Sequence, residues 1–267
     1  MLITMPELPE VETIARMLAP RLIGLRIRRV EIRARRVVAG DAGQLKALRG
    51  RPVERVNRRA KFLLLHFSRG VLAIHLGMTG QLRWNGRAGP HTRAVIVFDR
   101  GRLLFDDPRQ FGRLEASEEN PPRRLEKLGP EAQGITPAEL ARRLAGRRAP
   151  IKALLMDQRI LAGLGNIYSD EALFRAGIHP KTPGGRISRA RLARLVRAIR
   201  GVLAEAISAG GSSVSDYVNA DGEPGWFQFR HRVYRRTGEP CVRCGTPIRR
   251  IVIAQRGTHY CPRCQRR

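Results

Sequence analysis

Two cysteine pairs near the end of the chain constrain its fold more than any other feature. Cys241 pairs with Cys244 and Cys261 with Cys264, so all four cysteines fall within the last 27 residues. Each C-x-x-C pair offers two thiolates to one tetrahedral metal ion, and the intervening segment has the length of a β-hairpin. The spacing predicts one closed, structural Zn²⁺ site within a small module at 238–267. Two disulfides or free thiols are the alternative, which a reducing compartment disfavours.

The charge of the chain indicates a polyanionic partner. Lys and Arg number 51 against 23 Asp and Glu, a formal net charge of +28, and only five of the 51 are Lys. Arginine binds phosphate through two parallel hydrogen bonds, which favours a nucleic acid. A GC-rich genome explains Arg in place of Lys but not the net excess. A membrane role is weaker, because no basic amphipathic anchor, spanning apolar run or secretory signal is present.

The hydrophobic pattern changes its period along the chain. Apolar residues recur at helical spacing from about Glu7 to Leu22, where acidic residues and prolines mark a helix start. Short alternating or apolar runs follow, separated by turn residues, and predict an antiparallel sandwich or barrel. These strands are expected at 25–32, 53–56, 62–67, 71–76, 94–98 and 103–105.

The second half of the chain has a helical pattern. Residues 116–136 are polar and rich in Pro and Gly, and we place a linker at 121–136, between a first domain at 1–120 and a helical domain at 137–237. Helices are expected at 137–144, 151–156, 167–176 and 188–209, and a loop at 212–229. The fold class is therefore α+β and multidomain, with flanking helices on the N-terminal sandwich.

The segment Met5-Pro6-Glu7 carries the most distinctive chemistry. A chain that begins at Pro6 has a free secondary amine, which titrates near the usual α-amino value of about 8 and can attack a carbon to form an iminium. Glu7 and Glu10 stand beside it as candidate proton donors. Residues Met1–Thr4 precede this segment, and with them in place the nitrogen of Pro6 is an amide. The mechanism therefore depends on where the mature chain begins.

Other candidate residues have an ordinary interpretation when each is taken alone. Met78 and Phe111, in glycine-flanked loops, suit a wedge in a base stack but also a hydrophobic core. Asn166, after Gly163-Leu-Gly165, suits a phosphate site at a helix start or a packing turn. Lys61 and the hairpin residue Arg256 suit phosphate binding or solvated surface.

The motifs in this order resemble one family, the bacterial formamidopyrimidine-DNA glycosylases of the Fpg/Nei superfamily. The resemblance extends from Met5 to the end of the chain and is specific because all the motifs occur together. They are PELPEVE (6–12), RRAKFLLL (58–65), HLGMTG (75–80), DPRQFG (107–112), LMDQRILAGLGNIYSDEALF (155–174), AQRGTHYC (254–261) and the cysteine pairs. The endonuclease VIII branch typically begins with PEGPE, so the chain is similar to the glycosylase branch.

The resemblance implies a β-sandwich domain, a helix–two-turn–helix domain and a zinc hairpin, with double-stranded DNA containing oxidised bases in a basic cleft. It implies that Pro6 attacks C1′ of a flipped nucleotide, that Glu7 protonates the sugar or leaving group, and that Glu10 orients the opened sugar. Lys61 matches a phosphate contact with a role in β-elimination, and Arg256 one linked to δ-elimination. The residues that match gap-filling or other DNA contacts are Met78, Arg109, Phe111, His91, Arg147, Lys152 and Asn166.

Two departures from the family pattern stand out. Met1–Thr4 blocks the nucleophile, so we expect the working protein to lack these residues. Gln110 stands where the family often has Arg, at a contact to the strand opposite the lesion, but Arg109 and Phe111 are intact, so we expect little loss of function. We expect a monomer without an obligate protein partner in the bacterial cytoplasm, associated with the nucleoid when bound to DNA. A non-catalytic DNA-binding protein, or an RNA-associated zinc protein, is the alternative.

Overall fold

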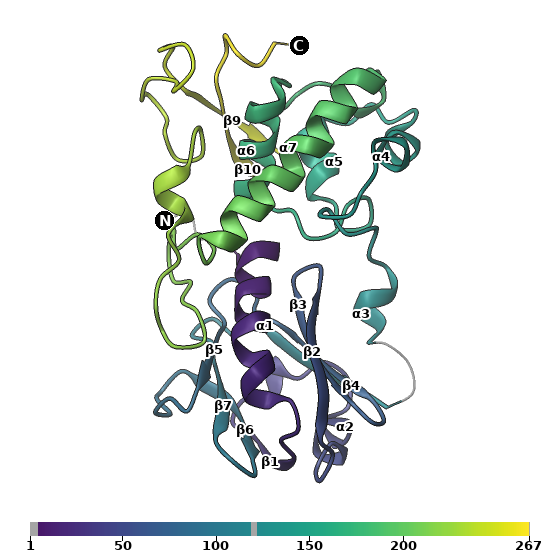
Figure 1. Cartoon of the computed structure of the whole chain (residues 1–267), viewed down its shortest axis with the longest axis vertical. Helices are drawn as coiled ribbons and strands as arrows, with labels where there is room; N and C mark the ends of the chain where they lie inside the picture. The colour runs from purple at the N-terminus through teal and green to yellow at the C-terminus, as the bar shows by residue number, and fades with distance from the viewer. Residues whose placement is uncertain (1–4, 119–121, 267) are drawn as a thin grey trace. The chain divides into compact units, whose positions relative to one another are not determined.

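A computed structural model describes residues 5–118 and 122–266 of the chain, and it divides into two compact units (Figure 1). The first unit runs up to Lys127 and also contains Ala209–Trp226. The second consists of Leu128–Ser208 and Phe227–Arg267. Residues Met1–Thr4, which we expect the working protein to lack, lie outside the described residues.

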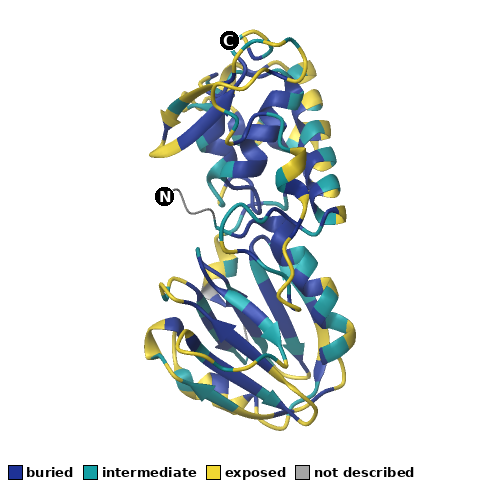
Figure 2. Ribbon diagram, turned by 90° about the vertical axis from the view of Figure 1, so that its left-hand side faces the viewer, coloured by how far each residue is buried: buried dark blue, intermediate teal, exposed yellow. Residues whose placement is uncertain are grey.

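The first unit is a sandwich of two four-stranded antiparallel sheets. One sheet has the strand order β1-β6-β7-β5 and the other β2-β3-β4-β8. Their inner faces supply most of one hydrophobic core, visible as buried strand segments in Figure 2. The strands are β1 (Ile27–Ile32), β2 (Val53–Arg59), β3 (Phe62–Phe67), β4 (Val71–His75), β5 (Gln81–Trp84), β6 (Thr92–Phe98), β7 (Arg102–Asp106) and β8 (Arg113–Ser117). The predicted antiparallel sandwich is confirmed.

Helix α1 (Leu8–Leu22) packs against β2 and β3 with its apolar side. Its buried residues recur every three or four positions, from Leu8 through Val11 and Leu18 to Leu22, because that spacing places them on one helix face. Two shorter helices complete the unit's regular structure, α2 (Ala42–Ala47) and α3 (Arg123–Glu126), with a 3₁₀ turn at Arg35–Val37.

The second unit is helical. Thr136 caps α4 (Pro137–Leu144) by accepting a hydrogen bond from the backbone N–H of Glu139. Gly177 ends α6 (Asn166–Ala176) in the left-handed conformation, which relieves the strain a side chain would bring there. Helix α7 (Arg189–Ser208) packs on α4 and α6. The remaining helices are α5 (Ile151–Met156) and the 3₁₀ turns Gly184–Arg186 and Phe227–Arg230.

A two-stranded hairpin of β9 (Arg249–Ile253) and β10 (Arg256–Tyr260) belongs to this second unit. Ala254 and Gln255, at its tip, both have positive φ, as a tight two-residue hairpin turn requires. The small core beneath the hairpin contains Phe174 and Val233 together with two of the cysteines. Sandwich, helical domain and hairpin together confirm the predicted fold class. Within the described residues, no helix is both long and apolar enough to cross a membrane.

Candidate functional site

Pro6, Glu7 and Glu10 are brought together at the start of α1. Glu7 is the N-cap and Glu10 the third helical residue, and the two form a capping box in which the backbone N–H of Glu7 donates to Oε2 of Glu10 (2.8 Å). Both glutamates are almost fully buried, and Pro6 is buried too. The helix start therefore fixes two carboxyl groups beside the proline within a closed environment.

The second carboxylate oxygen of Glu10 fixes a segment that is distant in the sequence. Its Oε1 accepts a hydrogen bond from the backbone N–H of Ser212 (2.8 Å). Gly211 has φ +86°, and a Cβ there would lie 3.0 Å from this same oxygen, so only glycine allows the close approach. Tyr217 is buried beside Glu10 and its hydroxyl donates to the carbonyl of Gly210 (3.1 Å). Burial, reinforced by the charge of Glu10, raises the pKa of Tyr217, so its hydroxyl stays a donor.

Lys61 lies in the tight turn between β2 and β3, where Ala60 has positive φ. Arg58 ties this turn to α1, because its Nε donates to Oε2 of Glu12 (2.9 Å) and its guanidinium also donates to the carbonyl of Ala60 (2.9 Å). Burial disfavours ionisation of Glu12, but hydrogen bonds from Arg16 and Arg58 outweigh it and lower its pKa. Lys61 is itself buried, and its position is thus fixed relative to the helix that carries Glu7 and Glu10.

A buried carboxylate, Asp107, joins the two loops that carry the predicted gap-filling residues. Its Oδ1 accepts from the hydroxyl of Thr79 (2.6 Å) and its Oδ2 from the backbone N–H of Gly112 (2.8 Å). Gly77 has φ +64°, and a Cβ there would come within 2.6 Å of the backbone at Phe111 and Gly112. The loops around residues 78 and 111 therefore pack backbone against backbone.

This arrangement brings Met78, Arg109 and Phe111 close together. The guanidinium carbon of Arg109 lies 4.8 Å from the centroid of the Phe111 ring, a cation–π contact. Both side chains are exposed, and Met78 is half-buried. The carbonyl of His91 accepts from the backbone N–H of Asp107 (2.9 Å), which attaches a further predicted DNA contact to the same cluster.

In the second unit, a second buried carboxylate, Asp170, connects three elements. Its Oδ1 accepts from the ammonium of Lys152 on α5, and its Oδ2 from the backbone N–H of His259 on β10 (2.9 Å). Lys152 is fully buried, and its ammonium also donates to the backbone carbonyl of Asn166 (3.3 Å). The Asn166 side chain donates to the hydroxyl of Tyr234 (3.4 Å). Lys152 and Asn166 therefore lie together, but only Asn166 has exposed surface.

The two remaining predicted residues of this unit are exposed. Arg147, between α4 and α5, donates from Nε to the carbonyl of Arg143 (2.7 Å). Arg256 begins β10 directly after the tip residues Ala254 and Gln255. Both guanidinium groups therefore lie where a phosphate can reach them.

The four cysteines form one cluster whose geometry fits zinc. Their sulfur atoms all lie within 4.8 Å of one another, and individual Sγ–Sγ distances are 3.9 Å for Cys241–Cys264 and 3.5 Å for Cys244–Cys261. Tetrahedral coordination with Zn–S bonds of about 2.3 Å places sulfurs about 3.8 Å apart. Four thiolates close the coordination sphere, so the predicted structural Zn²⁺ site is confirmed in its donor set.

Sequence reasoning assigned no role to Asp107, Asp170 or Ser212. The two aspartates stand inside recognised motifs, DPRQFG and NIYSDEALF, and an acidic residue within an otherwise apolar or glycine-rich motif was the available signal. Ser212 gave no signal, because its contribution is a backbone N–H directed at a residue 202 positions earlier.

Comparison with known proteins finds three family models that match consecutive parts of the chain. The formamidopyrimidine-DNA glycosylase N-terminal domain matches residues 5–114, and the formamidopyrimidine-DNA glycosylase H2TH domain matches residues 128–218. The zinc finger found in FPG and IleRS matches residues 238–267. The matches occur in the order that the motifs predicted.

Whole-length relatives agree with these matches. The formamidopyrimidine-DNA glycosylase of Solibacter usitatus is 53% identical over 266 residues, covering 98% of this chain and all of the relative. The crystal structure of MutM (FPG) from Thermus thermophilus has a TM-score of 0.89 at 46% identity and covers 97% of this chain and 98% of its own. The Lactococcus lactis Fpg, solved in complex with DNA containing an abasic site, has a TM-score of 0.90 at 35% identity and covers 98% of this chain and all of its own.

Proposed function

This chain belongs to the formamidopyrimidine-DNA glycosylase family, and from that premise we propose that it removes oxidised purines from duplex DNA and then cleaves the strand. Its substrates are 8-oxoguanine and formamidopyrimidines, and its place is base excision repair. The observation that carries the proposal is the helix start at Pro6, Glu7 and Glu10, where two buried carboxyl groups are fixed beside a proline.

The first step is nucleophilic displacement at the sugar. The nitrogen of Pro6, as a free secondary amine, forms a bond to C1′ while the glycosidic bond breaks and the base leaves with a proton. Loss of the amine proton and opening of the C1′–O4′ bond leave an iminium, and Glu7 supplies a proton to the ring oxygen or the leaving group. Glu10 is held by two backbone N–H groups, so it orients this end of the site and the opened sugar.

Strand cleavage follows from the iminium, which makes a C2′ proton acidic. Its removal expels the 3′ phosphate, and a second elimination expels the 5′ phosphate. Lys61, in its buried turn beside α1, serves the first elimination and its phosphate. Arg256, on the hairpin, binds phosphate for the second.

Base extrusion leaves a gap in the duplex, which the Met78, Arg109 and Phe111 cluster fills. His91, Arg147 and Asn166 contact the DNA backbone. Lys152 acts through Asn166, because its own side chain is fully buried against Asp170. Cys241, Cys244, Cys261 and Cys264 would hold a Zn²⁺ with four thiolates, and such an ion would supply only structure.

The family assignment also supports a cellular location, an oligomeric state and a binding partner. We place it in the bacterial cytoplasm as a monomer, on double-stranded DNA at the nucleoid, without an obligate protein partner. The net charge of +28 supports a steep salt dependence of DNA binding.

The test is borohydride trapping of the iminium on a duplex with 8-oxoguanine opposite cytosine, using a protein that begins at Pro6 and a Pro6→Gly variant. We expect a covalent adduct and strand cleavage with the first, and at least a roughly tenfold loss of adduct with the variant at unchanged DNA affinity. Full trapping by Pro6→Gly would overturn the assignment of the nucleophile. Tight binding without excision by either protein would support the non-catalytic alternative.

A further inference from the structure

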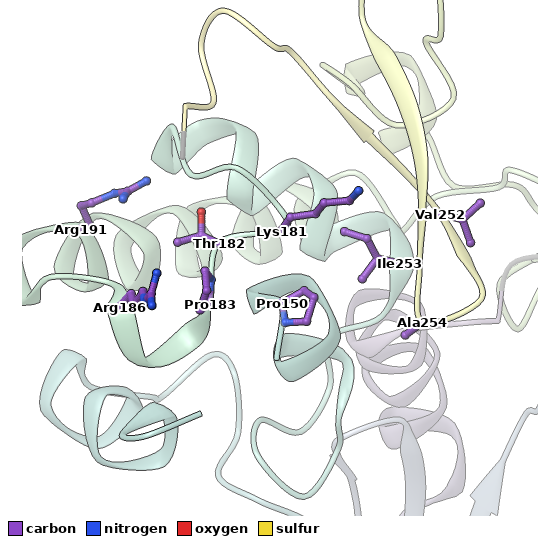
Figure 3. Close-up of a pocket in the computed structure, with 9 residues that line it drawn as sticks. All are labelled: Pro150, Lys181, Thr182, Pro183, Arg186, Arg191, Val252, Ile253 and Ala254. Carbon is purple, nitrogen blue, oxygen red and sulfur yellow. The ribbon is translucent and has the colours of Figure 1, made fainter. Parts of the chain in front are cut away.

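A pocket of about 630 Å³ lies within the second unit, between the turn that joins α6 to α7 and the hairpin strand β9 (Figure 3). Lys181, Arg186 and Arg191 line it on the helical side, and Val252 lines it on the hairpin. Figure 3 shows the Lys181 side chain extending toward the hairpin residues. The volume is within the range of about 300–1,000 Å³ typical of ligand sites, and it exceeds what a bare inorganic anion fills.

The described residues that line the pocket carry positive charge only. No acidic residue is among the described residues that line it. The two stretches of sequence that supply most of its wall, 172–204 and 240–267, contain no Asp or Glu. A concave surface with one sign of charge concentrates counter-ions of the opposite sign. The pocket therefore attracts an anion.

Two of the three cations have side chains without a partner among the described residues. In the part of the chain that the structure describes, the side chains of Lys181 and Arg186 form no ion pair or hydrogen bond, and both residues are exposed. By contrast, Arg175 of the same unit pairs with Glu205. Arg191 donates to the carbonyl of Arg266 (3.2 Å), which holds its guanidinium beside the pocket.

A buried hydroxyl in the same wall also lacks a partner. Thr182 is 5% exposed, and no described group forms a hydrogen bond with its Oγ1. Its backbone is fixed, since its N–H donates to the carbonyl of His179 (2.9 Å) and its carbonyl accepts from Ile151 (2.8 Å). A buried hydroxyl normally has a hydrogen-bond partner, so this residue of the pocket wall has an unused donor.

We propose that this pocket binds a backbone phosphate of duplex DNA outside the lesion, as a phosphate site separate from the one that serves Arg256. The proposal rests on the proposed function, because it assumes DNA as the partner. Ala254, in the pocket wall, lies two positions before Arg256 on the same hairpin. Val252, 62% exposed, and Pro150 give the pocket an apolar side suited to a deoxyribose, which a free inorganic phosphate lacks.

The experiment measures the salt dependence of binding to duplexes that carry a stable abasic analogue. One duplex has short flanks, and the other extends them by about one helical turn (~10 base pairs) on both sides. We compare the wild type with Lys181→Gln/Arg186→Gln. On the long duplex we expect the variant to lose about 0.9 of the slope of log K against log salt, since one neutralised phosphate contributes about that much. On the short duplex we expect the two proteins to bind alike.

The matched control is Arg194→Gln/Arg197→Gln, which removes the same charge from exposed positions of α7 outside the pocket. We expect its slope to stay within ~0.5 of the wild type on both duplexes. Equal slopes for the pocket variant and this control on the long duplex would overturn the proposal.

Two further measurements distinguish a failure of the phosphate-site proposal from a failure of the proposed function. Calorimetric titration with inorganic pyrophosphate detects a site for free phosphate. Saturable binding that the pocket variant loses, without any effect of duplex length, would assign the pocket to a soluble phosphate and overturn the DNA assignment. Base excision on the short duplex tests the proposed function alone. If the wild type fails to excise there but the long-duplex slopes still differ, the enzyme assignment is wrong and the phosphate site stands.

Discussion

Single buried carboxylates organise each part of the candidate site. Asp107 accepts hydrogen bonds from Thr79 and from the backbone of Gly112, and so joins the loops that carry Met78 and Phe111. Asp170 performs the same task in the second unit, between Lys152 and His259. A buried carboxylate is stable only when hydrogen bonds compensate its desolvation, so each of these networks has to form as a whole.

Replacement of Asp107 tests whether this carboxylate holds the two loops together. Asp107→Ala leaves the hydroxyl of Thr79 and the N–H of Gly112 without their partner, and we expect a loss of about 2–4 kcal/mol of unfolding free energy. Because the gap-filling loops are then free to shift, we also expect base excision to fall by roughly 10- to 100-fold in the folded protein. Denaturant unfolding and single-turnover excision measure the two effects. Asp107→Asn, which keeps one acceptor, should recover part of both.

Asp99→Ala is the control for this experiment. Asp99 lies in an exposed turn of the same unit and accepts from backbone N–H groups of Arg26 and Arg100. We expect its excision rate to match the wild type. If Asp107→Ala excises as fast as Asp99→Ala, Asp107 does not position the gap-filling residues.

Motif and spacing predict roles for Pro6, Glu7 and the four cysteines, but they do not predict the contacts that hold these residues in place. The contact from Ser212 to Glu10 has no such signature, because a backbone N–H in a Gly- and Ser-rich loop carries no pattern. Burial of Lys152 is equally invisible, since a lone Lys on a short helix looks like a solvated residue.

Among the elements, strand β4 contains a histidine, His75, that makes the folded state less stable as the pH falls. Burial, and then the positive charge of Lys61, Arg124 and Arg113, lower the pKa of His75 to about 4. Between pH 6.5 and 4 the unfolded chain therefore binds a proton that the folded chain does not. Stability contributed by neutral His75 is present above pH 6.5 and is lost as the pH falls toward 4.

We accordingly expect the unfolding free energy to decrease from pH 7 to pH 4.5 more steeply in the wild type than in His75→Gln. Urea unfolding at a series of pH values measures both slopes. His66→Gln is a useful comparison, because His66 is a second histidine of the same sheet whose pKa is also lowered by burial. Parallel slopes for the wild type and His75→Gln would show that His75 titrates as it does in the unfolded chain.

The hairpin of β9 and β10 depends on its metal. Its core has only a few apolar side chains, among them Phe174, Val233 and Ile248. Such a module is too small to fold by burial alone, so zinc binding and folding are coupled. We expect Cys244→Ala to lose its zinc and to bind DNA more weakly, while the sandwich unit keeps its fold. Metal analysis, circular dichroism and a binding titration measure these effects, and an unchanged zinc content would contradict the four-thiolate site.

Elements with several buried apolar residues were predictable, and elements with a single one were not. The predicted helices at 137–144 and 151–156 coincide with α4 and α5, and α6 begins one residue earlier than expected. Helix α2 and strand β5 were not predicted, because each has a single buried apolar residue, Leu45 or Leu82, and one residue shows no period. Strand β8 was placed partly in the polar connection, since its sequence RLEAS buries only Leu114 and Ala116.

For the whole molecule, the division into two units differs from the division that the sequence pattern predicts. We expect a helical domain at 137–237, and these boundaries stay a prediction. The structure places Ala209–Trp226 in the first compact unit, where the backbone N–H of Ser212 donates to Glu10 and Tyr217 packs in the core of the sandwich. The assignment of this segment to the first unit depends on contacts between residues that are distant in the sequence, and a local sequence pattern cannot predict such contacts.

The proposed reaction requires the nitrogen of Pro6 to be the nucleophile. The most direct measurement is borohydride trapping on a duplex with 8-oxoguanine opposite cytosine, comparing a protein that retains Met1–Thr4 with one that begins at Pro6. We predict a covalent adduct, joined through Pro6 in the mass spectrum, only for the form that begins at Pro6. An equal adduct with both forms, or none with either despite tight binding, would contradict it.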